Sequence, residues 1–581
     1  MPASEFLLCT GCDCPNHFMI PSSHSETSPS PIGDISSRAD LAHLKKSNEA
    51  PSDNEAVALR GIISSCKKRI DSLTKEKSAL ENFVVDLKRH IHASKQKIIA
   101  LQNERLQVDA QIHEWQPLLN PIRYVPPEIW SRIFNETIEF PTFPRASWNL
   151  DPHTGALSSF RWHLQSVESS LWAIEDVCNK WRNVVLNSPE LWSFINIVIN
   201  DSNFGPNAHR YTRRLGRQLG RTGKRPLSII ISCLDPSIFD GLPSQLTMML
   251  CTFSDSIRYL RLYLPSRMIK TIPSLGLPLP SLQTLFILST DTENINERLE
   301  LFPFCPKLRE LEFVDIDNPS RSFSLPWQQV TDYRCWSYRN GGPGASTHIL
   351  SLEQMICLQD CFLQCGLTNP FSNGAGLPSL RRAYRLLDLR SHEDGGETAI
   401  QQIMDRLTLP ILLQLKVACS AGNTPSFMDG AFAAIRHLID RSGPPLTLLH
   451  FCGARVAVKD LLHIIRSTPT LEDLQLTELR QDTITPELVH ALMLNPASGV
   501  INVPRLHTLH LSGVTKSGVS LLVDMICSRW ILDEGLSKHV SRLKLVKVDS
   551  DYDFLEHYSR MTVEPYDISQ WIKDGLACEF S

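Results

Sequence analysis

An unbroken alternation of four-residue and three-residue steps runs from Leu59 to Trp115 and constrains the fold more than any other feature of the chain. Fourteen of its seventeen positions are apolar, and no proline falls between them. Such spacing is the pattern of an α-helical coiled coil. We therefore predict a helix over residues 55–116 that packs its apolar stripe against another helix. The positions, called the seam below, are Leu59, Ile63, Cys66, Ile70, Leu73, Lys77, Leu80, Val84, Leu87, Ile91, Ser94, Ile98, Leu101, Arg105, Val108, Ile112 and Trp115.

A stripe this narrow stays in water unless a partner helix covers it. Lys77, Ser94 and Arg105 interrupt the stripe, and should fix register or partner choice at some cost in stability. The partner could be a second copy, another protein or a later part of this chain. We favour self-association as a homodimer through residues 59–115. Pro117 and Pro121 should end the helix.

Residues 1–54 are rich in Ser, Pro, Asn and Asp and lack a sustained hydrophobic period, so we expect a disordered tail. Within this tail Cys9, Cys12, Cys14 and His17 carry side chains that can bind zinc. Structural zinc sites usually place two ligand pairs around a folded loop, whereas these four residues crowd together. Solvated tail cysteines are therefore favoured, and we expect no bound metal.

The bulk composition excludes several classes of protein. With 581 residues, 42% of them hydrophobic, the chain can build two or more cores. A formal net charge of −4 implies no general attraction to nucleic acid or to anionic membranes. Sixteen cysteines without regular spacing, an N-terminus unlike a secretory signal, and no long apolar run indicate reduced thiols and no membrane span. We expect a soluble protein of the cytoplasm, the nucleus or both, which binds neither nucleic acid nor membranes.

Two segments, 121–134 and 171–192, have helical apolar spacing. Pro126 and Pro127 suit a helix entry, and Glu128 then lies in the first turn, where the helix dipole favours an acid. Two such helices cannot bury their apolar faces alone, so they must pack together. The residues that form these faces are Ile129, Ile133 and Phe134 in the first segment, and Leu171, Ile174, Val177, Cys178, Trp181, Val184 and Val185 in the second.

These residues resemble the F-box, which opens with Leu-Pro-x-Glu-Ile-x-x-x-Ile-Phe and carries Val-Cys-x-x-Trp-Arg on a later helix. The matching residues are Val125 (in place of Leu), Pro126, Glu128, Ile129, Ile133 and Phe134, then Val177, Cys178, Trp181 and Arg182. The following Ser188-Pro-Glu-Leu-Trp192 is similar to a sequence found after the box in many fungal F-box proteins. The family usually has a short connection where this chain has an insertion at 139–170. Whether the chain forms the middle helix of the box is therefore an open question. The alternative is an ordinary helical hairpin.

The resemblance implies that an F-box-like domain, residues 120–192, docks on a Skp-type adaptor, which joins it to a cullin scaffold. The chain would then be the substrate-recognition subunit of an SCF-type ubiquitin ligase and hold an unknown protein substrate. The alternative is a non-catalytic coiled-coil and repeat scaffold without ligase partnership, its box disabled by the insertion. The residues expected at the adaptor surface are Val125, Pro126, Glu128, Ile129, Ile133, Phe134 and Trp181.

After Trp192 the pattern becomes extended. Residues 194–199 and 226–232 are rich in β-branched residues and indicate buried strands. Between them, a basic segment has Tyr211, Leu215 and Leu219 at helical spacing. Its basic residues are favoured as the solvated face of a helix over a phosphate-contacting patch. They are Arg210, Arg213, Arg214, Arg217, Arg221, Lys224 and Arg225.

A motif of the form Pro-x-Leu-x-x-Leu-x-apolar recurs downstream, with looser copies between, at intervals of 22 to 35 residues. Leu-x-Leu suits a short strand with its leucines in a stacked core, and the intervening segments have helical spacing. The motif resembles degenerate leucine-rich repeats. We therefore predict an irregular leucine-rich-repeat solenoid over 193–550 and a cap or tail at 551–581. The alternative is a doubly wound α/β sheet. The clearest copies start at Pro280, Pro306, Pro410, Pro444, Pro469 and Pro504.

The fold class expected from these parts is α/β with many elements: a long N-terminal coiled-coil helix, a small helical F-box and then the solenoid. No phosphate-binding loop and no H-E-x-x-H metal motif occurs in the sequence. The turn at 341–346 lacks the order of a nucleophile elbow. We expect no catalytic residue and no cofactor, and hence a binding protein rather than an enzyme.

Overall fold

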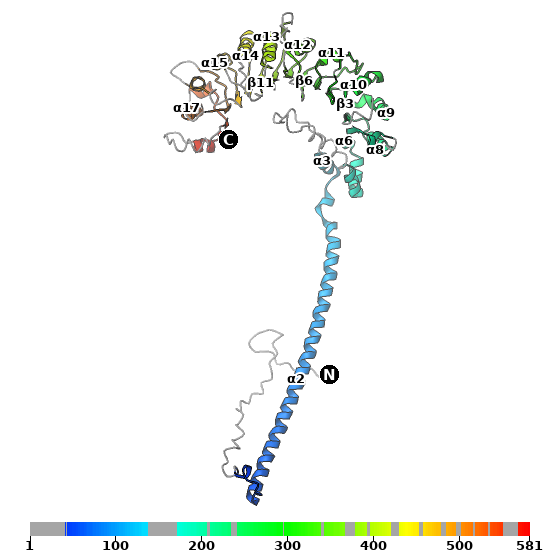
Figure 1. Ribbon diagram of the computed structural model, residues 1–581, viewed down its shortest axis with the longest axis vertical. Helices are drawn as coiled ribbons and strands as arrows, with labels where there is room; N and C mark the ends of the chain where they lie inside the picture. The colour runs from blue at the N-terminus through cyan, green and yellow to red at the C-terminus, as the bar shows by residue number, and fades with distance from the viewer. Residues whose placement is uncertain are drawn as a thin grey trace. The chain divides into compact units, whose positions relative to one another are not determined.

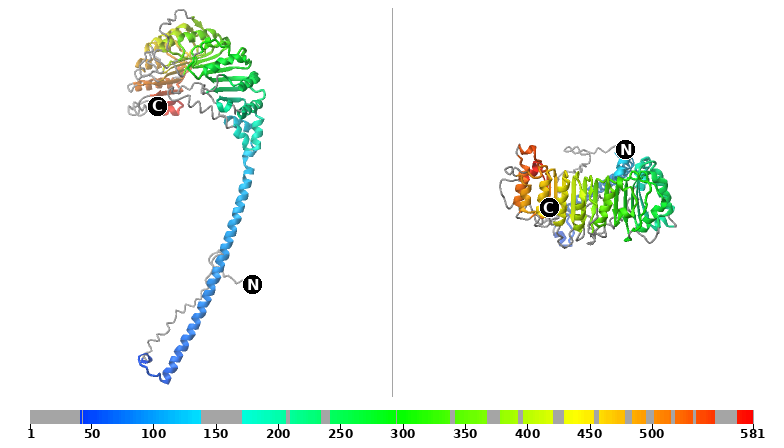
Figure 2. Two further views of the ribbon diagram at one scale, coloured as in Figure 1. Left: turned by 45° about the vertical axis from the view of Figure 1, so that its right-hand side comes forward. Right: turned by 90° about the horizontal axis from the view of Figure 1, so that it is seen from above.

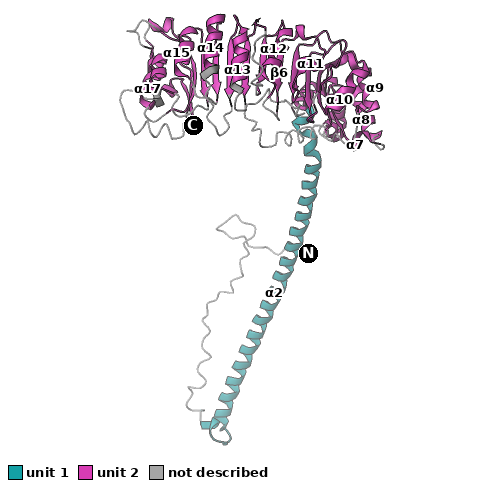
Figure 3. Ribbon diagram, turned by 45° about the horizontal axis from the view of Figure 1, so that its top comes forward, with its two compact units in different colours: residues 1–124 teal, residues 125–581 magenta. Residues whose placement is uncertain are grey.

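The computed structural model describes residues 41, 43–137, 171–205, 209–233, 241–293, 295–337, 342–366, 378–391, 396–419, 429–452, 457–477, 484–494, 501–514, 518–532, 535–549 and 568–580. The chain divides into two compact units, Met1–Tyr124 and Val125–Ser581 (Figure 3). The expected cysteine cluster at 9–17 and the insertion at 139–170 lie outside the described residues, as does most of the expected tail at 1–54.

The first unit contains one long helix, α2 (Asp53–Trp115), of 63 residues. It begins where Ser52 and Glu55 form a capping box, in which the Ser52 backbone N–H donates to Glu55 Oε2 at 2.8 Å. It ends before Pro117, and the short 3-10 turns η3 (Gln116–Leu119) and η4 (Pro121–Tyr124) follow. The predicted helix is confirmed, and no side chain along it is buried. Its pairing stays a prediction.

The second unit is built on one parallel sheet of 14 strands whose spatial order follows the chain. A separate two-stranded parallel sheet joins β8 (Leu380–Arg381) and β10 (Leu407–Thr408). The strands of the large sheet are β1 (Phe194–Ile199), β2 (Leu227–Cys233), β3 (Ile257–Leu264), β4 (Thr284–Ser289), β5 (Glu310–Val314), β6 (Asp332–Trp336), β7 (Asp360–Gln364), β9 (Leu386–Ser391), β11 (Gln414–Cys419), β12 (Leu448–Cys452), β13 (Asp473–Thr477), β14 (Thr508–Ser512), β15 (Leu545–Asp549) and β16 (Ala577–Phe580).

Helices connect most of the successive strands along the outer side of this curved sheet (Figures 1 and 2), whereas the described residues between β4 and β5 form no helix. Before β1, α3 (Pro127–Thr137), helical residues 171–177, α5 (Asn179–Leu186) and α6 (Pro189–Trp192) form a small group of their own. The helices that follow β1 are α7 (Asp201–Phe204), α8 (His209–Arg221), α9 (Ser244–Phe253), α10 (Ser266–Thr271), α11 (Pro319–Ser322), α12 (Ala345–Gln354), α13 (Gly396–Arg406), α14 (Asp429–Ser442), α15 (Val458–Ser467), α16 (Pro486–Leu492), α17 (Val519–Trp530) and α19 (Ile568–Lys573).

The main core lies between the sheet and these helices and is one continuous cluster from Ile195 to Leu576. The leucines of the recurring motif supply much of it, because alternate residues of a strand face the same side. In the strict copies, the leucine at the sixth position of the motif is at most 1% exposed. These leucines are Leu285, Leu311, Leu415, Leu449, Leu474 and Leu509. The strands at 194–199 and 226–232 are confirmed, with the second one residue shifted.

The predicted leucine-rich-repeat solenoid is wrong. The structure has an α/β architecture whose 14 strands pair in one continuous parallel sheet, and this sheet already begins at β1, upstream of the first motif copy. The helices in the crossovers differ widely in length, from four residues in α11 to 14 residues in α14. Any parallel strand with a buried face requires leucine-like alternation followed by a crossover, so the motif marks strands without specifying a repeat. A doubly wound sheet is also wrong, because the strand order never reverses.

Candidate partner-binding site

The group of helices before β1 has its own core, which we call the helical cluster. Its buried members come from α3, from residues 171–177, from α5 and from α6, so segments on both sides of the insertion meet here. The indole N–H of Trp192 donates to the Val185 carbonyl at 2.8 Å and thereby ties α6 to α5. The buried side chains are Trp130, Phe134, Leu171, Val184, Val185, Leu191 and Trp192.

Helix α3 has two apolar faces. It starts at Pro127, and the Pro126 carbonyl accepts from the Trp130 backbone N–H at 3.1 Å. Trp130 and Phe134 are 4% and 2% exposed and face the helical cluster. Ile129 and Ile133 lie one turn apart and are 44% and 40% exposed. A single apolar face for this helix was expected, and the structure instead divides its apolar residues between the cluster and the surface.

Three aromatic rings hold α3 in place. Trp181 of α5 lies against both aromatic residues of α3, with ring centroids 4.7 Å from Trp130 and 5.1 Å from Phe134. Trp130 and Phe134 are themselves stacked at 5.4 Å. Edge and offset arrangements of this kind add to the burial of the rings. The sequence analysis included Phe134 and Trp181 but missed Trp130, although its position one residue after Ile129 and four before Phe134 indicates the buried face.

The helix expected to run from Leu171 to Val185 is interrupted at Cys178. This residue is extended, with φ −162° and ψ 165°, and it caps α5 through its Sγ, which accepts from the Trp181 backbone N–H at 3.5 Å. Val177, which was expected on the apolar face, ends the helical run before this break and is 59% exposed. The apolar spacing from 171 to 185 continues through Cys178, so the sequence did not indicate that this residue ends one helix and caps the next.

The seven residues expected at the adaptor surface fall into three groups. Pro126, Glu128, Ile129 and Ile133 are exposed. Phe134 is buried, and Trp181 is partly buried against the helical cluster. Val125 is also partly buried there, and its carbonyl accepts from Lys180 Nζ at 2.9 Å. The structure therefore brings all seven to one small region, with some at its surface and others beneath it.

An arginine-rich helix joins the helical cluster to the sheet. Leu215 and Leu219 of α8 are buried, as expected for its inward face. Arg221, however, is not simply solvated: it donates to both carboxylate oxygens of Glu175, at 2.8 and 3.1 Å. Its guanidinium also lies 5.0 Å from the Trp172 ring centroid and 4.4 Å from that of Trp192. Such bidentate and stacked geometry fixes the cluster on α8.

A second candidate surface is the sheet face that points away from the main core. The residue between the two inward side chains of each strand forms one row across the sheet, because the parallel strands are in register. The motif contained this row as the residue between its last two apolar positions. From β5 to β15 the row is Glu312, Arg334, Phe362, Asp388, Lys416, His450, Gln475, His510 and Lys547.

Several titratable groups of this row are held in a poorly solvated setting. Asp388 is 2% exposed, and burial raises its pKa to about 6, although Arg390 lies 3.2 Å from its Oδ1. Burial lowers the pKa of His450 to about 4, and nearby Lys416 lowers it further. Burial also raises the pKa of Glu312. Fixed, partly desolvated charges can recognise complementary groups on a partner.

No family model matches the chain, and no curated protein is similar to it at a significant level. Within the described residues, no helix is both long and apolar enough to cross a membrane. The same residues contain no group of three His, Cys, Asp or Glu side chains placed to bind a metal ion.

Proposed function

We propose that the helical cluster docks a Skp-type adaptor and that the chain serves as the substrate-recognition subunit of an SCF-type ubiquitin ligase. The observation that carries this proposal is the exposed pair Ile129 and Ile133, which belongs to the segment resembling the F-box. Two exposed isoleucines one helical turn apart form an apolar patch that a protein partner could cover. Burying their remaining apolar surface is worth about 2 kcal/mol.

Some residues of the helical cluster would contact the adaptor, and others would support α3 from beneath. Ile129 and Ile133 would touch the adaptor, with Pro126 and Glu128 beside them at the start of α3. Trp130, Phe134 and Trp181 would hold α3 rigid from beneath, because their rings are packed on one another. A preformed contact surface loses little side-chain entropy on binding, which favours affinity.

The target protein would bind the open face of the sheet along its polar row. Arg334, Asp388 and Lys416 occupy this row on three different strands, so a partner crossing the strands would meet several fixed charges. The ligase mechanism that follows is proximity. A held lysine of the target experiences a high effective concentration of activated ubiquitin, and this chain makes no covalent bond itself.

The test is recovery of the adaptor with the full chain carrying Ile129→Asp and Ile133→Asp. Two charges at the contact should weaken adaptor binding roughly 100-fold, because they would be desolvated without partners. Folding should persist, since both positions are exposed. The matched control is Met248→Asp on α9, where the methionine is 71% exposed and lies outside the helical cluster.

Adaptor bound equally by the double variant and the wild type would refute the assigned contact. If the wild-type chain recovers no Skp-type adaptor at all, the ligase proposal fails as a whole. The scaffold without ligase partnership would then be favoured, with assembly through α2. Tryptophan fluorescence of each variant checks that the helical cluster remains folded.

A further inference from the structure

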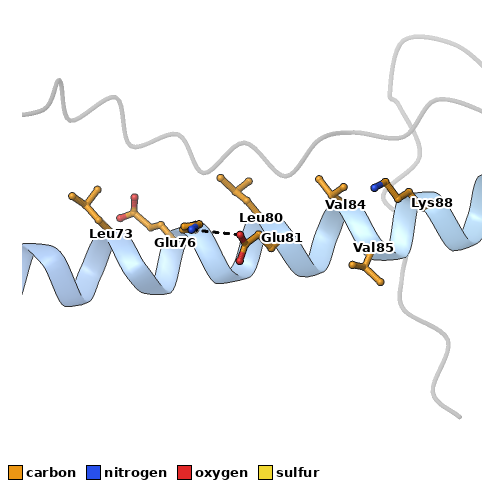
Figure 4. Close-up of a pocket in the computed structure, with 8 residues that line it drawn as sticks. Leu73, Glu76, Leu80, Glu81, Val84, Val85 and Lys88 are labelled. Carbon is orange, nitrogen blue, oxygen red and sulfur yellow. Dashed lines mark ion pairs between the residues drawn. The ribbon is translucent and has the colours of Figure 1, made fainter.

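Helix α2 leaves a continuous apolar surface in water. None of its 63 residues is buried, and most large apolar side chains along it are about half exposed or more. In Figure 4, Leu73, Leu80 and Val84 point to one side of the helix, whereas Val85 points away. At 1.5 Å per residue the helix is about 95 Å long. A helix in a protein gains most of its stability by packing its apolar face, and α2 has no such packing against the described residues along this length.

The two alternating classes of seam position hold different residue types. Positions that follow a four-residue step are mostly β-branched, and those that follow a three-residue step are mostly leucine. When β-branched residues occupy the first class of seam position and leucines the second, a coiled coil of two parallel helices is favoured. The β-branched members are Ile63, Ile70, Val84, Ile91, Ile98 and Ile112, and the leucines of the other class are Leu59, Leu73, Leu80, Leu87 and Leu101.

We infer that α2 pairs with α2 of a second copy, in parallel and in register. In that arrangement each seam residue faces its own copy, so Lys77, Ser94 and Arg105 occupy only three polar layers. In the opposite orientation with the fullest overlap of the two helices, Lys77 would face Ser94 and Arg105 would face Cys66. Four layers would then contain a polar residue, and two of them would set a cation against a cysteine.

The acidic neighbours of the two cations support the same register. Lys77 is preceded by Glu76 and followed four residues later by Glu81, whose Oε1 lies 3.7 Å from Lys77 Nζ (Figure 4). Arg105 repeats this arrangement four heptads on: Glu104 precedes it, and Asp109 lies 3.7 Å from it.

In a parallel pair, these acids flank the seam on both helices. Each layer of two cations would therefore be surrounded by four carboxylates, which offsets both the repulsion between the cations and that between the acids. A partner other than a second copy would have to supply the same pattern independently. The self-complementarity of the seam thus selects a second copy as its occupant.

Parallel pairing has a consequence for the chain as a whole. The second unit begins at Val125, ten residues after α2 ends at Trp115, so both copies of it leave from the same end of the pair. The assembly therefore contains two copies of the second unit. This inference rests on α2 alone and is independent of the proposed ligase function.

Neighbouring isoleucines provide a matched test of the seam. Ile98 and Ile99 are 54% and 50% exposed, but only Ile98 belongs to the seam. Sedimentation equilibrium of the full chain should show a dimer. Ile98→Asp should raise its dissociation constant roughly 100-fold, whereas Ile99→Asp should change it less than about threefold. A monomeric or tetrameric wild type, or equal effects of the two substitutions, would overturn the inference.

Cys66 tests orientation, because it lies on the seam and in a parallel pair faces its own copy. Mild oxidation of the full chain with diamide should yield a peptide linked from Cys66 to Cys66, absent from the Cys66→Ser variant. Mixing wild type with a Cys66→Ser, Arg105→Cys double variant tests the opposite orientation. A link between Cys66 and position 105 there, or no Cys66 link in a wild-type dimer, would exclude the parallel arrangement.

Discussion

Two leucines show how differently the two units of this protein use the same residue. Leu80 on α2 is 65% exposed, whereas Leu474 on β13 is completely buried. Both belong to regular apolar patterns that the sequence displays clearly. The pattern in the sheet is completed within one chain, because β13 lies between two neighbouring strands and helices cover the face of the sheet that points to the main core. The pattern on α2 is not completed by any described residue.

The contrast teaches that hydrophobic periodicity specifies a face to be buried but not the molecule that buries it. Fully burying a leucine is worth about 2 kcal/mol wherever the partner comes from. In the second unit this stabilisation belongs to the folding of one chain. In α2 it becomes available only on association, so its stability must depend on concentration.

The largest effect that tests this contrast comes from truncating each leucine to alanine. Leu474→Ala removes fully buried atoms from a packed core and should lower the free energy of unfolding of the second unit by about 4 kcal/mol. Leu80→Ala should leave that unfolding unchanged and instead weaken association. Urea titration followed by tryptophan fluorescence measures the first quantity, and sedimentation measures the second. Equal shifts of the urea midpoint for the two variants would contradict the separation.

A smaller effect probes the charges buried on the open sheet face. The folded pKa of Asp388 is about 6, above its ordinary value of 3.8, so the folded state binds more protons between these values. Its contribution to stability therefore falls as pH rises from about 4 to about 6. Relative to wild type, Asp388→Asn should gain on the order of 3 kcal/mol in unfolding free energy between pH 4 and pH 7.

His450 provides the control of opposite sign. Its folded pKa of about 4 lies below the ordinary 6.5, so the unfolded state binds more protons and the stability it contributes rises with pH across this window. His450→Gln should therefore lose stability relative to wild type between pH 4 and pH 7. Urea midpoints at four pH values decide both cases, and parallel trends for the two variants would be incompatible with these environments.

Particular residues show what the sequence could and could not predict. The inward leucines of the motif were predictable, because alternation in a strand reports one buried face. The joining of all strands into one sheet was not, since sequence spacing carries no information on which distant strands pair. On α3, spacing identified Ile129 and Ile133 but could not tell which apolar side chains stay exposed. Trp130 is buried against Trp181, about fifty positions away, whereas the cap at Cys178 is a local contact with the Trp181 backbone N–H that helical spacing does not report.

The smallest expected effect concerns Arg221 of α8, which connects the helical cluster to the sheet. Its contacts are polar and, like those of the buried leucines, are completed within one chain. Arg221→Lys keeps the charge but cannot reproduce the two hydrogen bonds to Glu175 or the stacking on Trp172 and Trp192. It should destabilise the helical cluster by about 2 kcal/mol. Arg210→Lys, on the exposed face of the same helix, should have almost no effect. Thermal melting followed by tryptophan fluorescence compares them. Identical melting would mean that the cluster is held by its apolar contacts alone.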